Sequence, residues 1–415
     1  MVVTHDIREL SDEKELTKAL EVFYTSLVGL PVPSGGGGIL DFVEAGRPLG
    51  LFLPGVDGDP DLVATAGSFT SRLTVPGAVR VPMAAVTDVG VLPTHTRRGL
   101  AGALIRRQLE QTAARGEIVA TLRASEATIY ERFGYGSASA VAAVEVDVAR
   151  ARLRPTLPIG DPGLVRFVEA RSSWELLARI YDDVEGNDVE GAGRIERPQL
   201  WWNGAAWGAN RNQDPLYVIV HGTPGAEDGY VRYHPTSTGP WFTATDRTLV
   251  IDDLVAHTPQ AYLALLRFLF TVDLVHRLVF SKLPVDHGLR SLVLDERALR
   301  TVGIVDETWL RLVDVPAALA ARGYQGSEAL TIAVTDALLP ANTGRYLVSA
   351  AGTRPTDELP DLSVDVATLA TVYLGGTRWW QLAQAGLVRE HRPGALAAAD
   401  QLFGTDRAPY AGTMF

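Results

Sequence analysis

The 415-residue chain contains no cysteine. Disulfides, cysteine-based zinc sites, iron–sulfur clusters and a thiol nucleophile that carries an acyl group are therefore excluded. Metal-ligand spacing is missing as well. The histidines stand apart in the sequence, at His5, His95, His221, His234, His257, His276, His287 and His391. We therefore expect no metal cofactor.

Long apolar runs are also scarce. The best candidate, residues 261–280, is interrupted by Arg267, Asp273, His276 and Arg277, so it does not predict a membrane span. The first residues carry no apolar run behind basic residues, so no signal peptide is predicted. A cytoplasmic protein that does not bind membranes is the simplest expectation.

Positively charged residues are fewer than negatively charged ones. The chain has 38 Lys and Arg residues and 49 Asp and Glu residues, so the formal net charge is −11. An acidic surface argues against binding to nucleic acid and is compatible with cationic substrates. The composition, 47% hydrophobic and 21% charged, is that of a globular protein and not of a disordered one. At about 100–200 residues each, roughly two to four domains are expected.

Helix-like and strand-like patterns alternate along the chain, which predicts a mixed α/β or α+β protein. In the first unit we expect helices at 12–27, 99–115 and 127–133, and strands at 51–53, 62–68, 71–75, 80–91, 118–123 and 137–148. A weaker version of this order repeats afterwards, and a third unit begins near Thr308. The Pro- and Gly-rich residues 31–38 are expected to form a solvated connection in preference to a mobile lid.

The strongest chemical signal is the turn that follows the predicted strand 80–91. A basic segment with Arg97, Arg98 and Gly99 leads directly into a helix. Free N–H groups at a helix start, the helix dipole and two arginines suit a pyrophosphate. Neither GK[ST] nor GxGxxG is present. From these residues alone, an ordinary strand–helix connection with solvated arginines is an equally good interpretation.

The same strand, turn and helix resemble motif A of the GCN5-related N-acetyltransferases (GNATs), which binds the pyrophosphate of acetyl-CoA. Residues 96–101 follow the family pattern Arg/Gln-x-x-Gly-x-Gly/Ala at the later positions, whereas Thr96 departs from the basic or amide residue at the first position. Further along, Ala-Ser-Glu at 124–126 and Tyr-x-x-Phe-Gly-Tyr at 130–135 are similar to the enhanced intracellular survival (Eis) family in particular.

This narrower resemblance covers the whole chain. It implies a catalytic GNAT domain over residues 1–150 and a degenerate GNAT-like domain over 151–303. A domain similar to sterol carrier proteins would follow over 304–415. It also implies a homohexamer, a trimer of dimers. The activity implied is acetyl-CoA-dependent N-acetyl transfer to aminoglycoside-like amines or to lysine side chains.

The resemblance also assigns roles to individual residues. Tyr130 is expected to be the general acid, and the carboxylate of Phe415 is expected to be the general base. The expected cofactor-binding residues are Val89, Gly90, Val91, Arg97, Arg98, Gly99, Leu100, Ala101, Gly102, Ser125 and Glu126. Of these, 89–91 would act through their backbone and 97–102 would hold the pyrophosphate.

General chemistry fits these roles. A strand that splays from its neighbour leaves N–H groups free for a thioester carbonyl. A tyrosine with a pKa of about 10 can protonate a leaving thiolate. A free α-carboxylate, with a pKa of about 3.3–3.7, is a weak base unless burial raises that pKa, so it could instead bind the ammonium or act through a water. Without cysteine, direct attack in a ternary complex is favoured.

Several alternatives stay open at this point. Tyr135 is a rival for the role of Tyr130, and chain ends such as Phe415 are usually frayed. His95, beside the basic turn, is more simply structural. The pairs at 201–202 and 379–380, both Trp-Trp, suit core packing better than a pocket. At the level of function, a lipid- or sterol-binding protein and a non-catalytic acetyl-CoA sensor are the rivals.

Overall fold

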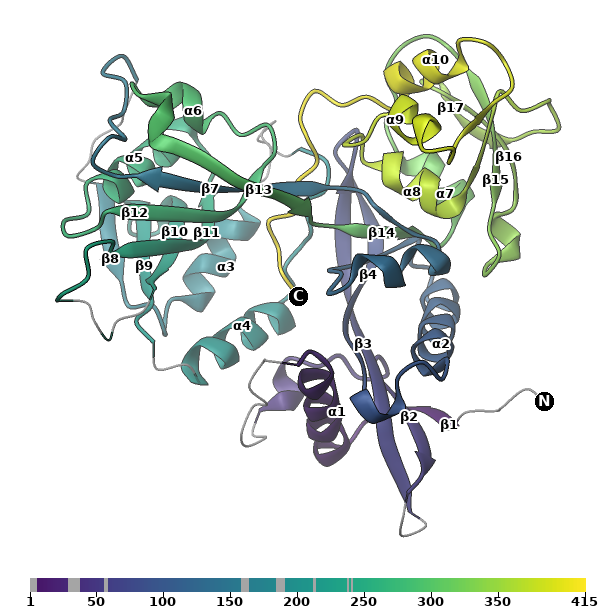
Figure 1. Cartoon of the computed structure of the whole chain (residues 1–415), viewed down its shortest axis with the longest axis horizontal. Coiled ribbons are helices and arrows are strands. Elements are labelled where there is room, and N and C mark those ends of the chain that lie inside the picture. The colour runs from purple at the N-terminus through teal and green to yellow at the C-terminus, as the bar shows by residue number, and fades with distance from the viewer. Residues whose placement is uncertain are drawn as a thin grey trace. The chain divides into compact units, whose positions relative to one another are not determined.

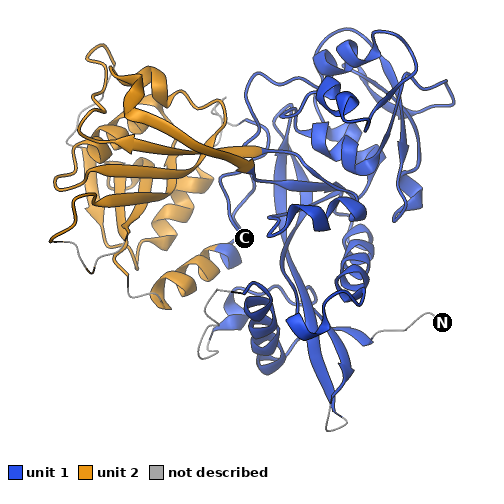
Figure 2. Cartoon of the chain, viewed as in Figure 1, with its two compact units in different colours: residues 1–139, 191–201, 306–415 blue, residues 140–190, 202–305 orange. Residues whose placement is uncertain are grey.

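The computed structural model describes residues 6–28, 38–55, 59–157, 164–183, 191–211, 214–236, 239 and 242–415. Most of the predicted glycine-rich connection, residues 31–37, lies outside this set. The described residues form three β-sheets (Figure 1). Figure 2 shows the two compact units of the chain: residues 1–139, 191–201 and 306–415 form unit 1, and residues 140–190 and 202–305 form unit 2.

The first sheet of unit 1 has seven strands in the order β1-β2-β3-β4-β5-β14-β6. Their bounds are β1 Asp6–Glu9, β2 Leu49–Pro54, β3 Pro60–Val75, β4 Val79–Val91, β5 Val119–Leu122, β6 Tyr135–Ser137 and β14 Trp309–Leu312. Neighbouring strands pair antiparallel except β4 and β5, which run parallel. β14, from the start of the predicted third unit, therefore completes the sheet of the first.

Two helices, α1 (Glu13–Ser26) and α2 (Leu100–Ala114), cover the two faces of this sheet (Figure 1). The apolar spacing of α1 buries Leu16 in one core cluster, and α2 buries Leu104 in another. Asp12 caps α1, because its side chain accepts the Glu15 N–H at 2.9 Å. The helical spacing of the apolar residues thus determines which side of each helix packs against the sheet.

The sheet of unit 2 has the order β13-β7-β12-β11-β10-β9-β8. Its strands are β7 Ala140–Asp147, β8 Val165–Val168, β9 Tyr217–Thr223, β10 Ala226–Pro235, β11 Thr248–Ala256, β12 Arg277–Pro284 and β13 Leu299–Asp306. The helices in this part of the chain are α3 Trp174–Asp182, α4 Gln199–Arg211, α5 Pro259–Phe270 and α6 Leu289–Leu292.

The strand expected over 137–148 is divided between the two sheets. β6 stays in the first sheet, whereas β7 joins the second. The break falls at Ala138 and Ser139. The Ala138 N–H bonds to the Thr308 carbonyl at 2.8 Å, and the Ser139 hydroxyl donates to Glu307 at 2.9 Å. These contacts take the chain out of the strand.

The third sheet, also in unit 1, has the order β17-β16-β15-β18-β19. Its elements are β15 Leu330–Thr335, β16 Gly344–Ser349, β17 Gly352–Pro355, β18 Leu362–Asp365, β19 Arg389–Glu390, α7 Val315–Ala321, α8 Val366–Tyr373, α9 Trp379–Gln384 and α10 Ala395–Leu402. A buried ion pair at 2.7 Å joins Arg311 of β14 to Asp336 after β15. The first and third sheets are thereby tied within one unit.

Two negative findings hold for the part of the chain that the structure describes. It contains no helix with the length and apolarity needed to cross a membrane. It also contains no cluster of three or more His, Cys, Asp or Glu side chains that could hold a metal ion.

Candidate active site

The candidate site lies at the splay, which is the point where β4 separates from β5. The two strands pair at three positions, Met83 with Val119, Ala84 with Ala120 and Ala85 with Thr121. β4 then continues to Val91, and in the described pairings this stretch has only β3 as its neighbour. The backbone groups of Val89, Gly90 and Val91 on the side of β5 are therefore available to a ligand.

A glycine turn connects β4 to α2 beyond the splay. After the short helix η2 (Pro93–His95), Arg97 and Gly99 adopt left-handed conformations with φ of 61° and 80°. Gly99 is the N-cap of α2 and provides no capping side chain. The first N–H groups of α2 are thus left without a side-chain cap, which is the arrangement that binds phosphates.

The side chains of this turn are partly engaged with the turn itself. Arg98 donates to the Thr94 carbonyl at 3.2 Å, and Thr96 donates to the Pro93 carbonyl at 3.2 Å. Arg97 and Arg98 are both exposed. His95 bonds through Nδ1 to the Thr94 hydroxyl at 2.9 Å, a local structural contact. The turn therefore presents two cationic side chains and a helix N-terminus at one place.

The remaining residues of the predicted turn differ in what they can offer. Leu100 is buried in the core beside Leu104, so its side chain is not available to a ligand. Ala101 and Gly102 are half-buried, and Gly90 is buried. Contacts from these positions to a cofactor would have to come from backbone atoms. The residues present fit a pyrophosphate group through N–H donors and two guanidinium groups.

Tyr130 lies between the short helices η3 (Ala127–Ile129) and η4 (Glu131–Phe133). It packs in one cluster with Val86 of β4 and Leu122 of β5, so it sits beside both splayed strands. Burial raises its pKa, and the phenol stays protonated at neutral pH. A protonated phenol at this position can donate a proton.

Tyr135 lies next to Tyr130, with ring centroids 5.9 Å apart. It is completely buried, and its hydroxyl has no hydrogen-bond partner among the residues that the structure describes. Tyr130 keeps 5% of its surface exposed. Tyr130 is therefore also buried, but of the two rings it is the one that keeps a small accessible surface. Ser125 and Glu126 are exposed between β5 and η3, and Glu126 accepts a bond from Thr128 at 2.9 Å.

The end of the chain is anchored and not frayed. Buried Glu307 accepts the N–H groups of Ala411 at 3.0 Å and Gly412 at 2.9 Å, besides the Ser139 hydroxyl. Arg123, directly after β5, donates from Nε to the Thr413 carbonyl at 3.1 Å.

Two further side chains hold the last residues. Arg197 donates to the Thr413 hydroxyl and to the Gly412 carbonyl, both at 3.0 Å. The Trp201 indole N–H donates to the Met414 carbonyl at 2.6 Å. Trp201 thus binds the end of the chain, whereas Trp202 and Trp379 are core residues. No local motif marks Arg123, Arg197 or Glu307, because their partners lie far away in the sequence.

The Phe415 ring is held by two contacts of the first sheet. It packs edge-on against Phe69 of β3, with centroids 5.5 Å apart, and the Arg123 guanidinium carbon lies 5.4 Å from its centroid. Phe69 lies in β3, and Arg123 directly follows the last residue of β5. The terminal residue is therefore placed at the first sheet.

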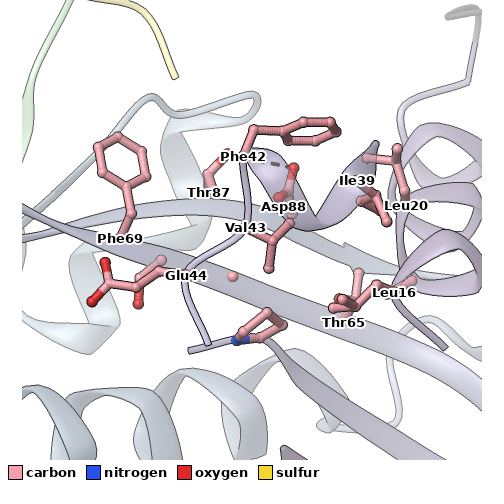
Figure 3. Close-up of a pocket in the computed structure, with 14 residues that line it drawn as sticks. Leu16, Leu20, Ile39, Phe42, Val43, Glu44, Thr65, Phe69, Thr87 and Asp88 are labelled. Atoms are coloured by element: carbon pink, nitrogen blue, oxygen red, sulfur yellow. Dashed lines mark hydrogen bonds between the residues drawn. The ribbon is translucent and has the colours of Figure 1, made fainter. Parts of the chain in front are cut away.

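A pocket opens on the α1 side of the same sheet. Figure 3 shows its walls, which come from α1, the segment after η1 (Ile39–Asp41), β3 and β4. Phe69, which contacts Phe415, lines this pocket, and so do Thr87 and Asp88 directly before the predicted cofactor strand. The pocket therefore adjoins both the splay and the chain end.

Unit 2 repeats the strand arrangement but not the helix start. β11 and β12 pair parallel from Thr248 to Ile251, and β11 continues to Ala256. At the start of α5, however, the Thr258 side chain accepts the Ala261 N–H at 3.0 Å. Pro259 occupies the first turn and has no N–H. Two of the donors that α2 offers are therefore missing in α5, because the Ala261 N–H is capped and Pro259 has no N–H.

The role of Glu307 can be tested by Glu307→Ala. The change leaves buried N–H groups of the chain end without an acceptor, so we expect a loss of about 2–4 kcal/mol in unfolding free energy. Urea unfolding measures this loss, and carboxypeptidase digestion should release terminal residues faster. Glu358→Ala removes an exposed carboxylate and serves as the control. A chain end as resistant as in the wild type would show that Glu307 does not anchor it.

Comparison with known families gives three matches along the chain. Residues 7–138 match an acetyltransferase (GNAT) domain, residues 193–312 match a second acetyltransferase (GNAT) domain, and residues 315–412 match a sterol carrier protein domain.

Relatives match this chain over most of their length. The chain is 39% identical over 365 residues to an uncharacterized N-acetyltransferase of Streptomyces coelicolor, covering 85% of this chain and 86% of the relative. It is 34% identical over 366 residues to the N-acetyltransferase Eis of Mycobacterium tuberculosis, covering 83% and 84%. The crystal structure of Eis1 from Mycobacterium abscessus matches with a TM-score of 0.87 and 47% identity, over 99% of this chain and 100% of that one.

Proposed function

The chain belongs to the Eis family of GCN5-related N-acetyltransferases, and from this membership we propose that it transfers the acetyl group of acetyl-CoA to the amine of a cationic substrate. The amines that the resemblance implies are those of aminoglycoside-like molecules or of lysine side chains. The amine would attack directly in a ternary complex. One observation carries the proposal: β4 splays from β5 directly before an uncapped helix N-terminus.

We assign the roles within this reaction as follows. The backbone of residues 89–91 binds the acetyl end of the cofactor, residues 97–102 hold its pyrophosphate, and Ser125 and Glu126 lie against it. Tyr130 holds the proton that the departing sulfur takes up. The Phe415 carboxylate orients the amine or accepts its proton. Acetyl-CoA supplies the activated acyl group.

The three sequence segments divide this work. Residues 1–150 provide the catalytic surface, 151–303 have lost the cofactor site, and 304–415 deliver the chain end. A lipid- or sterol-binding function of the third segment is the rival. Against it, the interior there is filled by Tyr373, Trp379 and Phe403, all buried. Well-packed aromatic rings favour a structural role.

The experiment is a panel of amines incubated with acetyl-CoA and assayed for release of free thiol. We expect turnover with at least one class of primary amine. A protein that binds acetyl-CoA but acetylates no amine would be a sensor. A protein that binds lipid and no acetyl-CoA would support the sterol-carrier interpretation.

Acetyl-CoA should bind at one site per chain, because Thr258 and Pro259 block the helix start in unit 2. Isothermal titration measures this stoichiometry. Arg97→Ala combined with Arg98→Ala should weaken binding roughly tenfold or more, since two charge-assisted phosphate contacts are lost. Arg267→Ala, on the exposed face of α5, is the control and should leave binding unchanged. A second site per chain would contradict a degenerate unit 2.

We also propose that the chain assembles as a homohexamer. The edge strand β13 supports association, because Val302, Ile304 and Val305 expose apolar side chains there. Exposed apolar edge strands invite pairing or burial. Light scattering in solution tests the mass. A monomer at micromolar concentration would refute the assembly.

A further inference from the structure

Asp88 lies at an irregular point of β4. The register of β3 and β4 shifts between Thr65 and Gly67, and Asp88 adopts a left-handed conformation with φ of 53°. This bulge turns its side chain into the pocket on the α1 side (Figure 3). Across the ladder stands Gly67, where a Cβ atom would come within 3.2 Å of the Asp88 Oδ2. The absence of a side chain at Gly67 leaves room for the carboxylate.

The Asp88 carboxylate has no cationic partner among the described residues. Its one hydrogen bond is a long contact of 3.4 Å from the Thr87 hydroxyl. Burial raises the pKa of Asp88 to about 6, so the group is mainly ionised at neutral pH. Asp88 is half-buried in the pocket wall, and an anion in such a position without a counter-ion favours binding of a cation.

Glu44, the other ionisable residue of the pocket wall, is in the opposite situation. Burial alone would raise its pKa, but hydrogen bonds from Thr70 and the charge of Arg47 lower it below its usual value. Arg47 donates to Glu44 at 3.1 Å, and the Thr70 hydroxyl donates at 2.7 Å. Glu44 is therefore already satisfied. α1 and β3 add no further ionisable side chain to the lining.

The rest of the pocket is mostly apolar. Its walls include Leu16, Leu20, Ile39, Phe42, Val43 and Phe69. Apolar walls around one polar anchor are typical of a small-molecule site that fixes the orientation of its ligand. A ligand with several charges would have to bury the additional charges against these walls, which is unfavourable.

We infer that Asp88 anchors the ammonium group of an acceptor amine that carries a single positive charge on an aliphatic or aromatic arm. This inference rests on the proposed acetyltransferase function. It narrows the substrate class to amines with one charge, and so sets aside the aminoglycoside-like amines that carry several. Asp88 directly precedes Val89, so an amine held by its carboxylate lies beside the backbone assigned to the acetyl group. The bound ammonium gives up one proton, to the Asp88 or the Phe415 carboxylate, before its free lone pair attacks the thioester carbonyl. The arm of the amine would occupy the apolar part of the pocket.

The test compares wild type, Asp88→Asn and the control Asp357→Asn, which alters an exposed aspartate after β17. Binding of 2-phenylethylamine and of its uncharged isostere 2-phenylethanol is measured by isothermal titration. Acetylation of 2-phenylethylamine, hexylamine, spermidine and kanamycin is followed by thiol release. Thermal melting checks that Asp88→Asn folds, and we expect it to melt no lower than wild type.

We expect Asp88→Asn to need roughly 10- to 100-fold more phenylethylamine than wild type, both for half-saturation of binding and for half-maximal turnover, because a charged hydrogen bond to the ammonium is lost. Acetyl-CoA affinity and the binding of phenylethanol should not change. In wild type, kcat/KM should fall as the pH drops below about 6, because Asp88 becomes protonated. In the Asp88→Asn variant, kcat/KM should no longer fall at acidic pH. Substitution of a residue with a purely structural role would not change this pH dependence.

Failure of the role assigned to Asp88 and failure of the proposed acetyltransferase function would give different results. If amines are acetylated but Asp88→Asn leaves half-saturation and the acidic limb unchanged, the role of Asp88 is wrong while the acetyltransferase function stands. If spermidine or kanamycin shows the higher kcat/KM, the single-charge substrate class is wrong. If phenylethylamine binds in an Asp88-dependent way but no amine is acetylated, the anchor stands and the proposed function fails.

Discussion

A C-terminal tag is expected to reduce acetyl transfer at least about 100-fold, whereas the same tag at the N-terminus should leave the rate intact. The expected loss of rate comes from displacement of the terminal carboxylate. If the Phe415 carboxylate serves the amine, a tag moves the carboxylate away while it keeps a carboxylate on the chain. A misplacement of about 1 Å can already cost roughly 100-fold. Steady-state kinetics of the two tagged proteins on one amine measure the difference.

Two more changes separate charge from position. Deletion of Phe415 moves the carboxylate to Met414, about 3.5 Å away. Amidation of the terminus removes the charge and keeps the ring. Both should depress turnover, while acetyl-CoA affinity survives, because the anchoring contacts of Arg123, Arg197 and Glu307 are made to residues 411–413. Equal rates for both tagged proteins would reduce Phe415 to a packing residue.

Tyr130→Phe should slow turnover by roughly 100- to 10,000-fold, the range found for loss of a general acid. The ring stays in the cluster with Val86 and Leu122, so cofactor affinity should hardly change. Since burial raises the pKa of Tyr130, loss of its proton should not limit the rate at pH values near neutrality. Pre-steady-state rates of thiol release are the appropriate measurement.

Tyr135→Phe is the matched control. It removes a hydroxyl that is buried and has no partner in the described part of the chain, so the variant should be at least as stable as wild type and fully active. If Tyr135→Phe is slow and Tyr130→Phe is not, the two tyrosines exchange roles. If neither is slow, no phenol acts as the acid.

Local patterns were sufficient to predict the Eis-family membership, the mixed α/β class, the two GNAT domains with a sterol-carrier-like domain after them, and the N-acetyltransferase activity, all of which are confirmed. The basic turn before α2 and the helix period of α1 depend on neighbours within a few residues. They are therefore visible in the sequence. Roles of individual residues stay predictions.

Non-local pairing could not be predicted in the same way. Whether Trp309–Leu312 pairs with β5 and β6 or with a later strand depends on partners far along the chain, which strand periodicity does not specify. The same holds for Glu307, whose acceptor role needs the chain end to return beside it. Asp88 gave no signal either, because a bulge and an opposing glycine create its environment.

The most direct measurement is mass balance in a single reaction of the full chain with acetyl-CoA and a primary amine such as 2-phenylethylamine. Mass spectrometry follows the amine and the protein, and a thiol reagent follows the cofactor. Direct transfer predicts one acetylated amine for each thiol released, and no acetylated protein when the amine is omitted. Acetyl-CoA bound tightly with no acetylated amine formed, from this or any other amine tested, would contradict an acetyltransferase site at the splay of β4 and β5.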